Sequence, residues 1–382
     1  MSNQLRTELG CKVSYWKIYN GMEHAKSNVR GTHEHGYAVL NVYHYMLEVA
    51  NPGSKKTLSL DENERFKYFF VSYAAWMTGF QEMRKVIAVD GTFLRSKYEG
   101  VLLSVVAQNA ENHIFPASKY SKDGFDYLPR SHYATGVFDG CEFNDHFNQI
   151  RDLVPKRCKL STRLVPHTEQ EFCHGNRYNI MTSNIAELVN SMFDVEREFP
   201  IVTLFDEINK RFALLFYQRR MKLVNSANRF VPSIEKDISK YVNVDNKLLA
   251  HQITNYKFSV TGHGDVATVD LQRRTCTCRI FDLDKIPYPY AMAALRAQYG
   301  ADFGNQIYEY SSPYYSVEKY IMTYCKKIHP VPPEDSWIVL LNVIEREIPP
   351  PYVDPSKPGR RRYKRRRGVG ESFPTRKNKC SV

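Results

Sequence analysis

The sequence lacks any run of 18 or more apolar residues, and it therefore predicts no membrane-spanning helix. Its first six residues lack the apolar core of a secretory signal peptide. Its eight cysteines are scattered along the chain, a distribution that is typical of a reducing compartment. Only Cys276 and Cys278 have a spacing that suits metal ligands. These absences argue against membrane proteins and against disulfide-rich secreted proteins.

Apolar residues make up 43% of the 382 residues and aromatic residues 13%, which is enough for a sizeable folded core. The net charge of +12 is concentrated near the end, because residues 359–382 contain ten lysines and arginines and one acid. Such a tail is typical of a nuclear address or of an arm that binds phosphates. The tail residues expected to contact nucleic acid are Arg360, Arg361, Arg362, Lys364, Arg365, Arg366 and Arg367.

The first half of the chain predicts helices followed by strands. Residues 1–60 form a helical region, with the breaker Asn-Pro-Gly-Ser near its end. Runs of aromatic and β-branched residues predict strands at 66–73, 86–90 and 101–107, arranged as an antiparallel meander. Residues 109–142 show no clear periodicity, and we expect them to be irregular.

Asp90 follows the four apolar residues of the second strand. Asp is a poor strand former, so we expect it at the strand's end, where Gly91 and Thr92 turn the chain. That edge of a mixed sheet is where ligands and metals are usually held. Asp90 could instead only cap a hairpin through its own backbone. The local sequence leaves both interpretations open.

The second half predicts more helices and a small hairpin. Glu187 lies near the start of a long helix that begins at Ile185, off the main apolar stripe of that helix. The eight prolines of residues 330–358 predict an extended linker. The other predicted elements are helices at 143–153, 201–223 and 291–297, and a hairpin of strands 256–260 and 266–271.

Seven segments form an ordered set: residues 30–37, 66–71, 86–93, 113–116, 175–187, 276–281 and 350–355. Taken in this order, they resemble plant Mutator-like element transposases. The likeness extends over most of the chain, and the ordered set is far more specific than any single segment.

The resemblance implies an α/β (α+β) fold. Its parts are a degenerate ribonuclease-H-like core with flanking helices, a small ββα module like a SWIM-type zinc finger, and a disordered basic tail. The implied domains are a helical N-terminal region (1–60), a truncated transposase core (61–225), the finger-like module (250–300), and a proline-rich linker with the tail (330–382).

In that family three carboxylates hold two divalent metal ions for DNA cutting and joining. Hard Mg²⁺ or Mn²⁺ prefers oxygen ligands, and a pair of ions about 3.5–4 Å apart stabilises the attacking and leaving oxygens. Asp90 matches the family's first acid and Glu187 its third. The block that carries the second Asp is missing. The acids left in the gap, none of which follows an apolar strand, are Asp123, Asp126 and Asp139.

The zinc finger of the family has a Cys-x-Cys pair followed by a Cys-x-His pair, which together give a tetrahedral Zn²⁺ site. Cys276 and Cys278 match the first pair, but Tyr288 replaces the second Cys and Tyr290 replaces the His. A phenol with a pKa near 10 is a poor Zn²⁺ ligand at neutral pH. The zinc site is therefore partial. Without metal, the module must depend on Phe281, Ile286 and an alanine-rich helix for packing.

The resemblance implies a nuclear, catalytically inactive transposase derivative that binds DNA without sequence preference through its tail and retains at most residual zinc binding. The alternative is an active metal-dependent DDE-type DNA transposase that uses Asp90 and Glu187 with an unidentified third ligand. A third possibility is a product that never reaches a stable fold, because lost core strands expose sheet edges.

Overall fold

The computed structural model describes residues 14–84, 87–121, 188, 191–245, 247–262, 264–339 and 341–353. The chain divides into two compact units, residues 1–351 and residues 352–382, and the elements below belong to the first. They combine helices with two antiparallel sheets, which confirms the predicted α+β class. Among the described helices, none has the length and apolar character needed to cross a membrane.

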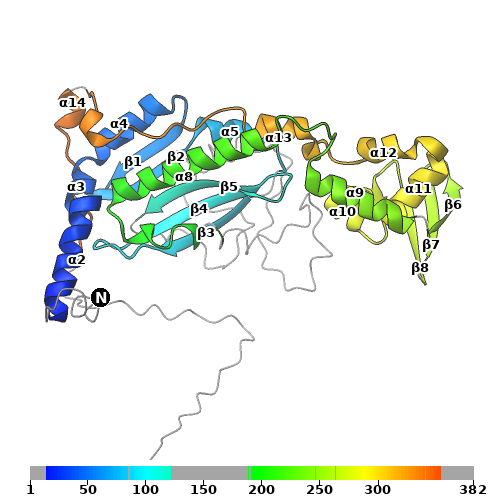
Figure 1. The fold of residues 1–382 in the computed structure, drawn as a ribbon, viewed down its shortest axis with the longest axis horizontal. Coiled ribbons are helices and arrows are strands. Elements are labelled where there is room, and N and C mark those ends of the chain that lie inside the picture. The colour runs from blue at the N-terminus through cyan, green and yellow to red at the C-terminus, as the bar shows by residue number, and fades with distance from the viewer. Residues whose placement is uncertain are drawn as a thin grey trace, which may run out of the picture. The chain divides into compact units, whose positions relative to one another are not determined.

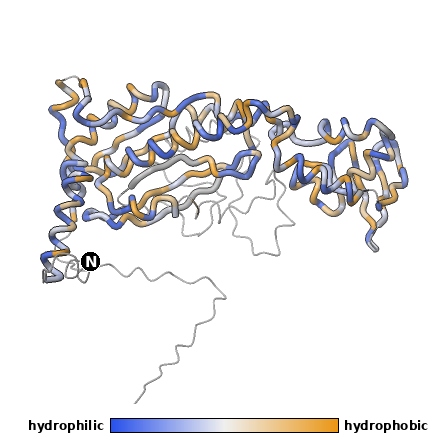
Figure 2. Tube along the Cα trace, viewed as in Figure 1, coloured by the Kyte–Doolittle hydropathy of each residue, from blue (hydrophilic) through white to orange (hydrophobic). Residues whose placement is uncertain are grey.

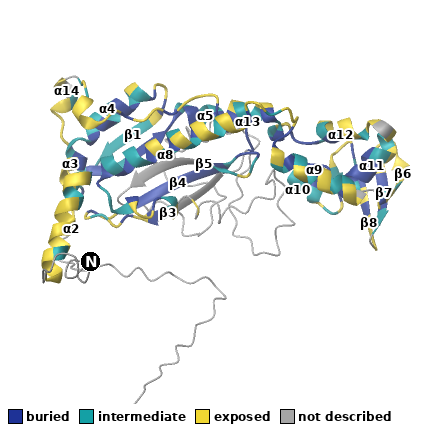
Figure 3. Cartoon of the chain, viewed as in Figure 1, coloured by how far each residue is buried: buried dark blue, intermediate teal, exposed yellow. Residues whose placement is uncertain are grey.

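Three helices open the described chain: α2 (Tyr15–Arg30), α3 (His33–Ala38) and α4 (Leu40–Ala50). The side chains of Ser14 and Thr32 accept backbone N–H groups at the starts of α2 and α3 and so satisfy helix-end donors. No residue of α2 is buried, and Figure 3 shows it largely exposed. The helices of the predicted N-terminal region (1–60) end at Ala50, and its last residues belong to strand β1, which begins at Lys55.

The larger sheet has five antiparallel strands in the order β1-β2-β5-β4-β3. Their bounds are β1 (Lys55–Leu60), β2 (Phe66–Ser72), β3 (Ile87–Phe93), β4 (Val101–Gln108) and β5 (Ile114–Ser121). All of β4 except its last residue is buried, as its continuous apolar run predicts. The three predicted strands are confirmed, but their predicted order as a meander was wrong, because β5 pairs between β2 and β4 and so separates β2 from β3. The sequence missed β1, and it also missed β5, which lies in the stretch predicted to be irregular.

Strand β3 continues beyond the predicted turn. Gly91 and Thr92 pair with Leu103 and Leu102 of β4, so Asp90 lies inside the strand and the prediction that it ends the strand was wrong. The physical reason is that pairing along the buried strand β4 outweighs the weak strand propensity of Asp. The chain turns only after Leu94, whose N–H donates to the carbonyl oxygen of Gly100 at 2.9 Å.

Helix α8 (Ile201–Lys222) lies across one face of this sheet (Figure 1), where the sequence predicts a helix at 201–223. Apolar and polar residues intermix along it (Figure 2). Phe205 packs on Phe69 of β2 at 4.7 Å between ring centroids, and Phe216 packs on Phe115 of β5 at 5.1 Å. A second helix, α5 (Ala74–Gln81), connects β2 to β3. The short helix η2 (Glu196–Glu198) precedes α8.

The smaller sheet has four antiparallel strands in the order β6-β7-β8-β9, and helix α11 packs against β6, β7 and β8. Residues 250–300 of this region are the predicted finger-like module, and the name is kept for them below. Strands β7 and β8 confirm the predicted hairpin, and α11 contains the predicted helix 291–297. The bounds are β6 (Leu249–Thr254), β7 (Lys257–Gly262), β8 (Asp265–Asp270), β9 (Thr275–Cys276), α9 (Pro232–Asp245), α10 (Ile280–Asp284), α11 (Pro289–Tyr299), η3 (Gly300–Asp302) and α12 (Phe303–Tyr310).

The chain beyond the module returns to the larger sheet and the N-terminal helices. The backbone N–H of Phe66 in β2 donates to the carbonyl oxygen of Pro349 at 3.0 Å, and Ile348 is buried. The part of the predicted linker up to residue 351 therefore packs against the rest of the fold. The turns and helices that follow α12 are η4 (Pro313–Tyr315), α13 (Val317–Thr323), η5 (Glu334–Ser336) and α14 (Leu341–Ile344).

Candidate functional site

Asp90 is the fourth of the seven residues of β3, and its register partner is Ser104 on β4. Strand β3 is the last strand in the sheet order, so the described residues pair it on one side only. The hydroxyl of Ser104 is fully buried and has no hydrogen-bond partner in the described part of the chain. The side chain of Asp90 lies outside the described structure, and its place is fixed by the backbone alone.

Two arginines occupy the far end of β3. Arg197 of η2 donates from Nη1 to the hydroxyl of Thr92 at 2.6 Å. Both Arg197 and Arg95 pair with the carboxylate of Asp194. A carboxylate that already neutralises two guanidinium groups is a poor candidate for a metal ligand. Asp194 is therefore already engaged as the partner of Arg95 and Arg197.

The remaining predicted catalytic and tail residues lie outside the described residues. This holds for Glu187, for the acids of the gap (Asp123, Asp126 and Asp139) and for the basic run from Arg360 to Arg367. Within the described ranges, no group of three or more His, Cys, Asp or Glu side chains could hold a metal ion.

The two predicted zinc ligands are close together. Cys276 ends β9 and Cys278 follows in the turn before α10, with their Sγ atoms 3.0 Å apart. Both are free thiols, Cys276 buried and Cys278 half-buried. The close contact with the sulfur of Cys276, together with the backbone N–H groups of Ile280 and Phe281, lowers the pKa of Cys278 to about 6. The same sulfur–sulfur contact and burial raise the pKa of Cys276.

The tyrosines that replace the other two ligands stand at the start of α11. Tyr288 is the N-cap of the helix, and its ring packs edge-on against that of Tyr241 at 5.1 Å between centroids. Burial raises the pKa of Tyr290, and the nearby charges of Asp265 and of Cys278 raise it further. Its phenol therefore stays protonated at neutral pH, where it is a weaker metal ligand than the His of the pattern. The described donor set does not complete a tetrahedral zinc site.

The sequence missed a basic hollow beside helix α8. It has a volume of about 90 Å³ and is lined on one side by Phe216, Tyr217 and Arg220. Lys326 and Lys327 line the other side and are exposed. The three cations of this hollow come from two segments far apart in the sequence, so no local charge run marks it. Its one local mark in the sequence is the basic last turn of α8, which contains Arg219, Arg220 and Lys222.

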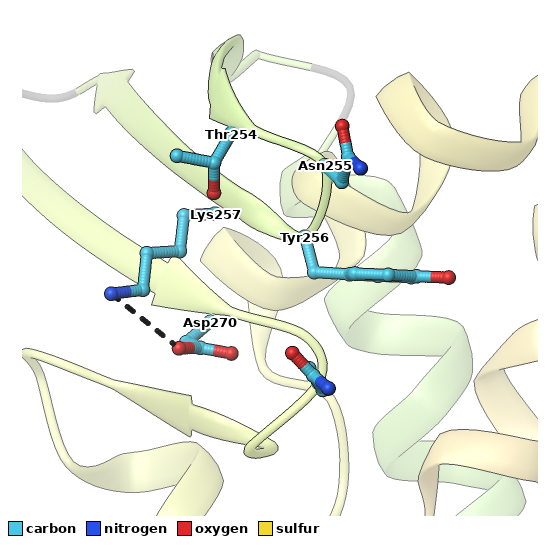
Figure 4. Close-up of a pocket in the computed structure, with 6 residues that line it drawn as sticks. Thr254, Asn255, Tyr256, Lys257 and Asp270 are labelled. Atoms are coloured by element: carbon cyan, nitrogen blue, oxygen red, sulfur yellow. Dashed lines mark ion pairs between the residues drawn. The ribbon is translucent and has the colours of Figure 1, made fainter.

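A larger, shallow cleft lies at the tip of the β6–β7 hairpin (Figure 4). It has a volume of about 450 Å³, and the ammonium group of Lys257 lies 3.9 Å from a carboxylate oxygen of Asp270 inside it. Thr254, Asn255, Tyr256 and Gln272 complete its lining. Its polar groups include no nucleophile–base pair and no metal-binding set.

Compared with models of protein families, with curated proteins and with solved structures, the chain matches none.

Proposed function

We propose that this chain is a catalytically inactive derivative of a Mutator-like transposase that binds nucleic acid in the nucleus. The proposal begins from the ordered set of motifs in the sequence, which covers most of the chain. It takes the larger sheet as the remnant of a ribonuclease-H-like core. It takes residues 250–300 as a finger-like module of the SWIM type that has lost half of its zinc ligands.

The proposed loss of catalysis is supported mainly by what lies next to strand β3. A two-metal centre needs several carboxylates around each ion. The described sheet ends at the strand of Asp90, and the acid at the end of that strand, Asp194, is held by two arginines. This arrangement supports the inference that the block carrying the second ligand is gone. Mg²⁺ or Mn²⁺ would then have no complete site.

Two groups of cations support nucleic-acid binding. The first is the basic run of residues 360–367, which would contact phosphates without reading sequence. The second is the hollow of Arg220, Lys326 and Lys327 beside α8, where Tyr217 adds an exposed aromatic ring. Aromatic rings next to cations are typical of surfaces that bind single-stranded nucleic acid. The tail has more charges, and we therefore assign it the larger share of affinity.

Retention on immobilised DNA at low salt tests the binding part of the proposal. Deleting residues 359–382 should abolish most retention, whereas the triple variant Arg220→Ala, Lys326→Ala, Lys327→Ala should weaken it less. If all seven basic residues of the run contact phosphates, the affinity should fall with a log–log salt slope of about −6. Unchanged retention after the deletion would refute the role of the tail.

The alternative is an active DDE-type transposase in which Asp90 and Glu187 share their metals with an unidentified third ligand. It predicts DNA nicking or strand transfer that depends on Mg²⁺ or Mn²⁺ and is lost in both Asp90→Ala and Glu187→Gln. The inactive derivative predicts no difference between the wild-type chain and these variants. Zinc binding at Cys276 and Cys278 remains a prediction, which the phenols of Tyr288 and Tyr290 weaken.

A further inference from the structure

The Cys276–Cys278 pair is a compact sulfur site inside the finger-like module. The two Sγ atoms are 3.0 Å apart, and both cysteines are free. Cys276 is only 5% exposed and belongs to the apolar core, and Cys278 packs against that core. The site therefore presents two adjacent soft ligands in a largely dry environment.

The backbone between the two sulfurs is held firmly. Thr277 donates its N–H to the carbonyl oxygen of Thr268 on β8 at 3.0 Å, and its hydroxyl accepts the N–H of the same Thr268 at 3.0 Å. The N–H of Arg279 donates to the carbonyl oxygen of Cys276 at 2.8 Å. The loop is thus pre-organised, and rotation of the cysteine side chains is the main freedom left. Pre-organisation lowers the entropic cost of binding.

The surroundings suit a site with net negative charge and few ligands. The backbone N–H groups of Ile280 and Phe281 are directed at the sulfur of Cys278. Phe281 is 1% exposed, and the ring of Tyr290 packs against the same core. No third His, Cys, Asp or Glu joins the two sulfurs in a metal-binding group within the described ranges.

Two sulfur ligands without a third partner do not satisfy Zn²⁺, which takes four ligands in structural sites. They do satisfy a soft monovalent d¹⁰ cation, because thiolates select Cu(I) and such ions accept two ligands. We propose that Cys276 and Cys278 form a two-coordinate site for Cu(I). The inference stands on the geometry of the pair and does not depend on the proposed transposase origin.

Binding would place one Cu(I) ion on the two sulfurs, each as a thiolate. Any S–H bond still present breaks, the sulfur keeps its electron pair and donates it to copper, and the proton leaves to solvent. Copper remains Cu(I), so no oxidant or reductant is needed. With metal–sulfur bonds of about 2.3 Å, as for Zn–S, a linear site would separate the sulfurs by about 4.6 Å. The half-buried side chain of Cys278 is the one free to swing outward.

Copper retention by the reduced full-length chain tests this proposal. The chain is loaded with Cu(I) under nitrogen and then desalted against bicinchoninate, a chelator that competes for Cu(I). We expect one Cu(I) per chain to be retained, with two sulfur neighbours in X-ray absorption. Cys278→Ser and Cys276→Ser should each lose this ion. Cys325→Ser is the matched control, because Cys325 is an exposed free thiol, and it should keep the ion.

Two outcomes would overturn the proposal. The first is equal copper retention by the wild-type chain and Cys278→Ser, with unchanged circular dichroism. The second is displacement of Cu(I) from the wild-type chain by equimolar Zn²⁺. A reciprocal variant sharpens the test, because Tyr288→Cys with Tyr290→His restores a four-ligand set. That double variant should retain Zn²⁺ where the wild-type chain does not, and equal zinc retention by both would also contradict the proposal.

Discussion

The larger sheet and the finger-like module differ in what surrounds the place where the family resemblance implies a missing ligand. In the sheet, the strand of Asp90 is left at the margin, with β4 as its one described neighbour. In the module, apolar packing stands where a complete metal site is implied, because Phe281 and Ile286 are buried and α11 places most of its residues in the core. A missing metal ligand can be replaced by packing, whereas a missing catalytic carboxylate cannot.

The largest expected effect tests whether packing alone holds the module together. Phe281→Ala removes a ring that is 1% exposed, and it should lower the free energy of unfolding by about 3–5 kcal/mol in urea denaturation. Val266→Ala, at a position 68% exposed in the same module, should stay within about 0.5 kcal/mol of the wild-type chain. Equal effects would contradict the assigned core. Cooperative unfolding of the wild-type chain would itself exclude a product without a stable fold.

The next effect concerns the helix that covers the larger sheet beside β5. A Cβ atom on Gly79 of α5 would lie 2.1 Å from the carbonyl oxygen of Thr323 and 2.9 Å from the ring of Phe115. Gly79→Ala should therefore cost about 3 kcal/mol through overpacking, measured by urea denaturation. Gly304→Ala is the control, because nothing lies within 4 Å of its Cβ, and it should stabilise α12 slightly. A neutral Gly79→Ala would contradict the close approach of α5 and α13.

A smaller effect is the pH-dependent contribution of Glu34, in helix α3, to the stability of the fold. The ammonium group of Lys97 and the hydroxyl of Tyr98 lower the pKa of Glu34 from 4.5 to about 2. Since the pKa is lowered in the folded chain, the carboxylate stabilises the fold above about pH 4.5, and this contribution is lost as the pH falls toward 2. Half of the Glu34 side chain is exposed, so the contribution should be under about 1 kcal/mol.

Acid titration of unfolding measures this contribution. The difference in stability between the wild-type chain and Glu34→Gln should be largest near neutral pH and should shrink between pH 4.5 and 2. A difference that does not change across this window would show that Glu34 is not held by Lys97 and Tyr98.

The smallest expected effect is that of removing metal from the finger-like module. A large effect would contradict the difference drawn between the module and the larger sheet. Classical zinc fingers unfold without their metal. Because apolar residues hold the finger-like module, EDTA should leave its melting temperature unchanged within about 1 °C. Circular dichroism of the purified chain with and without the chelator measures this. A large drop that Zn²⁺ restores would show that the module still depends on a divalent metal.

The sequence predicted the elements whose signal is local. The apolar run of β4, the helix α8 and the hairpin of β7 and β8 are all where their patterns indicate. It missed β5, which contains Pro116 opposite Val106, because a proline argues against a central strand and the pairing with β2 is distant in sequence. It misplaced the end of β3 for a similar reason, since register with β4 decided the outcome.

The candidate site was predictable to a lesser degree. The closeness of Cys276 and Cys278 follows from their spacing, whereas the place of Tyr288 and Tyr290 at the start of α11 was missed, because the predicted helix began only at residue 291. The hollow of Arg220, Lys326 and Lys327 depends on two segments that meet only in the folded chain, so its charge could not be found by reading along the sequence. The arginines that hold Asp194 are another long-range feature of this kind.

Nicking of supercoiled plasmid by the purified full-length chain tests the central claim most directly. The rate is measured with Mg²⁺ and with Mn²⁺, beside Asp90→Ala prepared in the same way. The proposed loss of the second carboxylate predicts no metal-dependent nicking above that of Asp90→Ala. Metal-dependent nicking by the wild-type chain that disappears in Asp90→Ala would contradict the account and establish an active transposase.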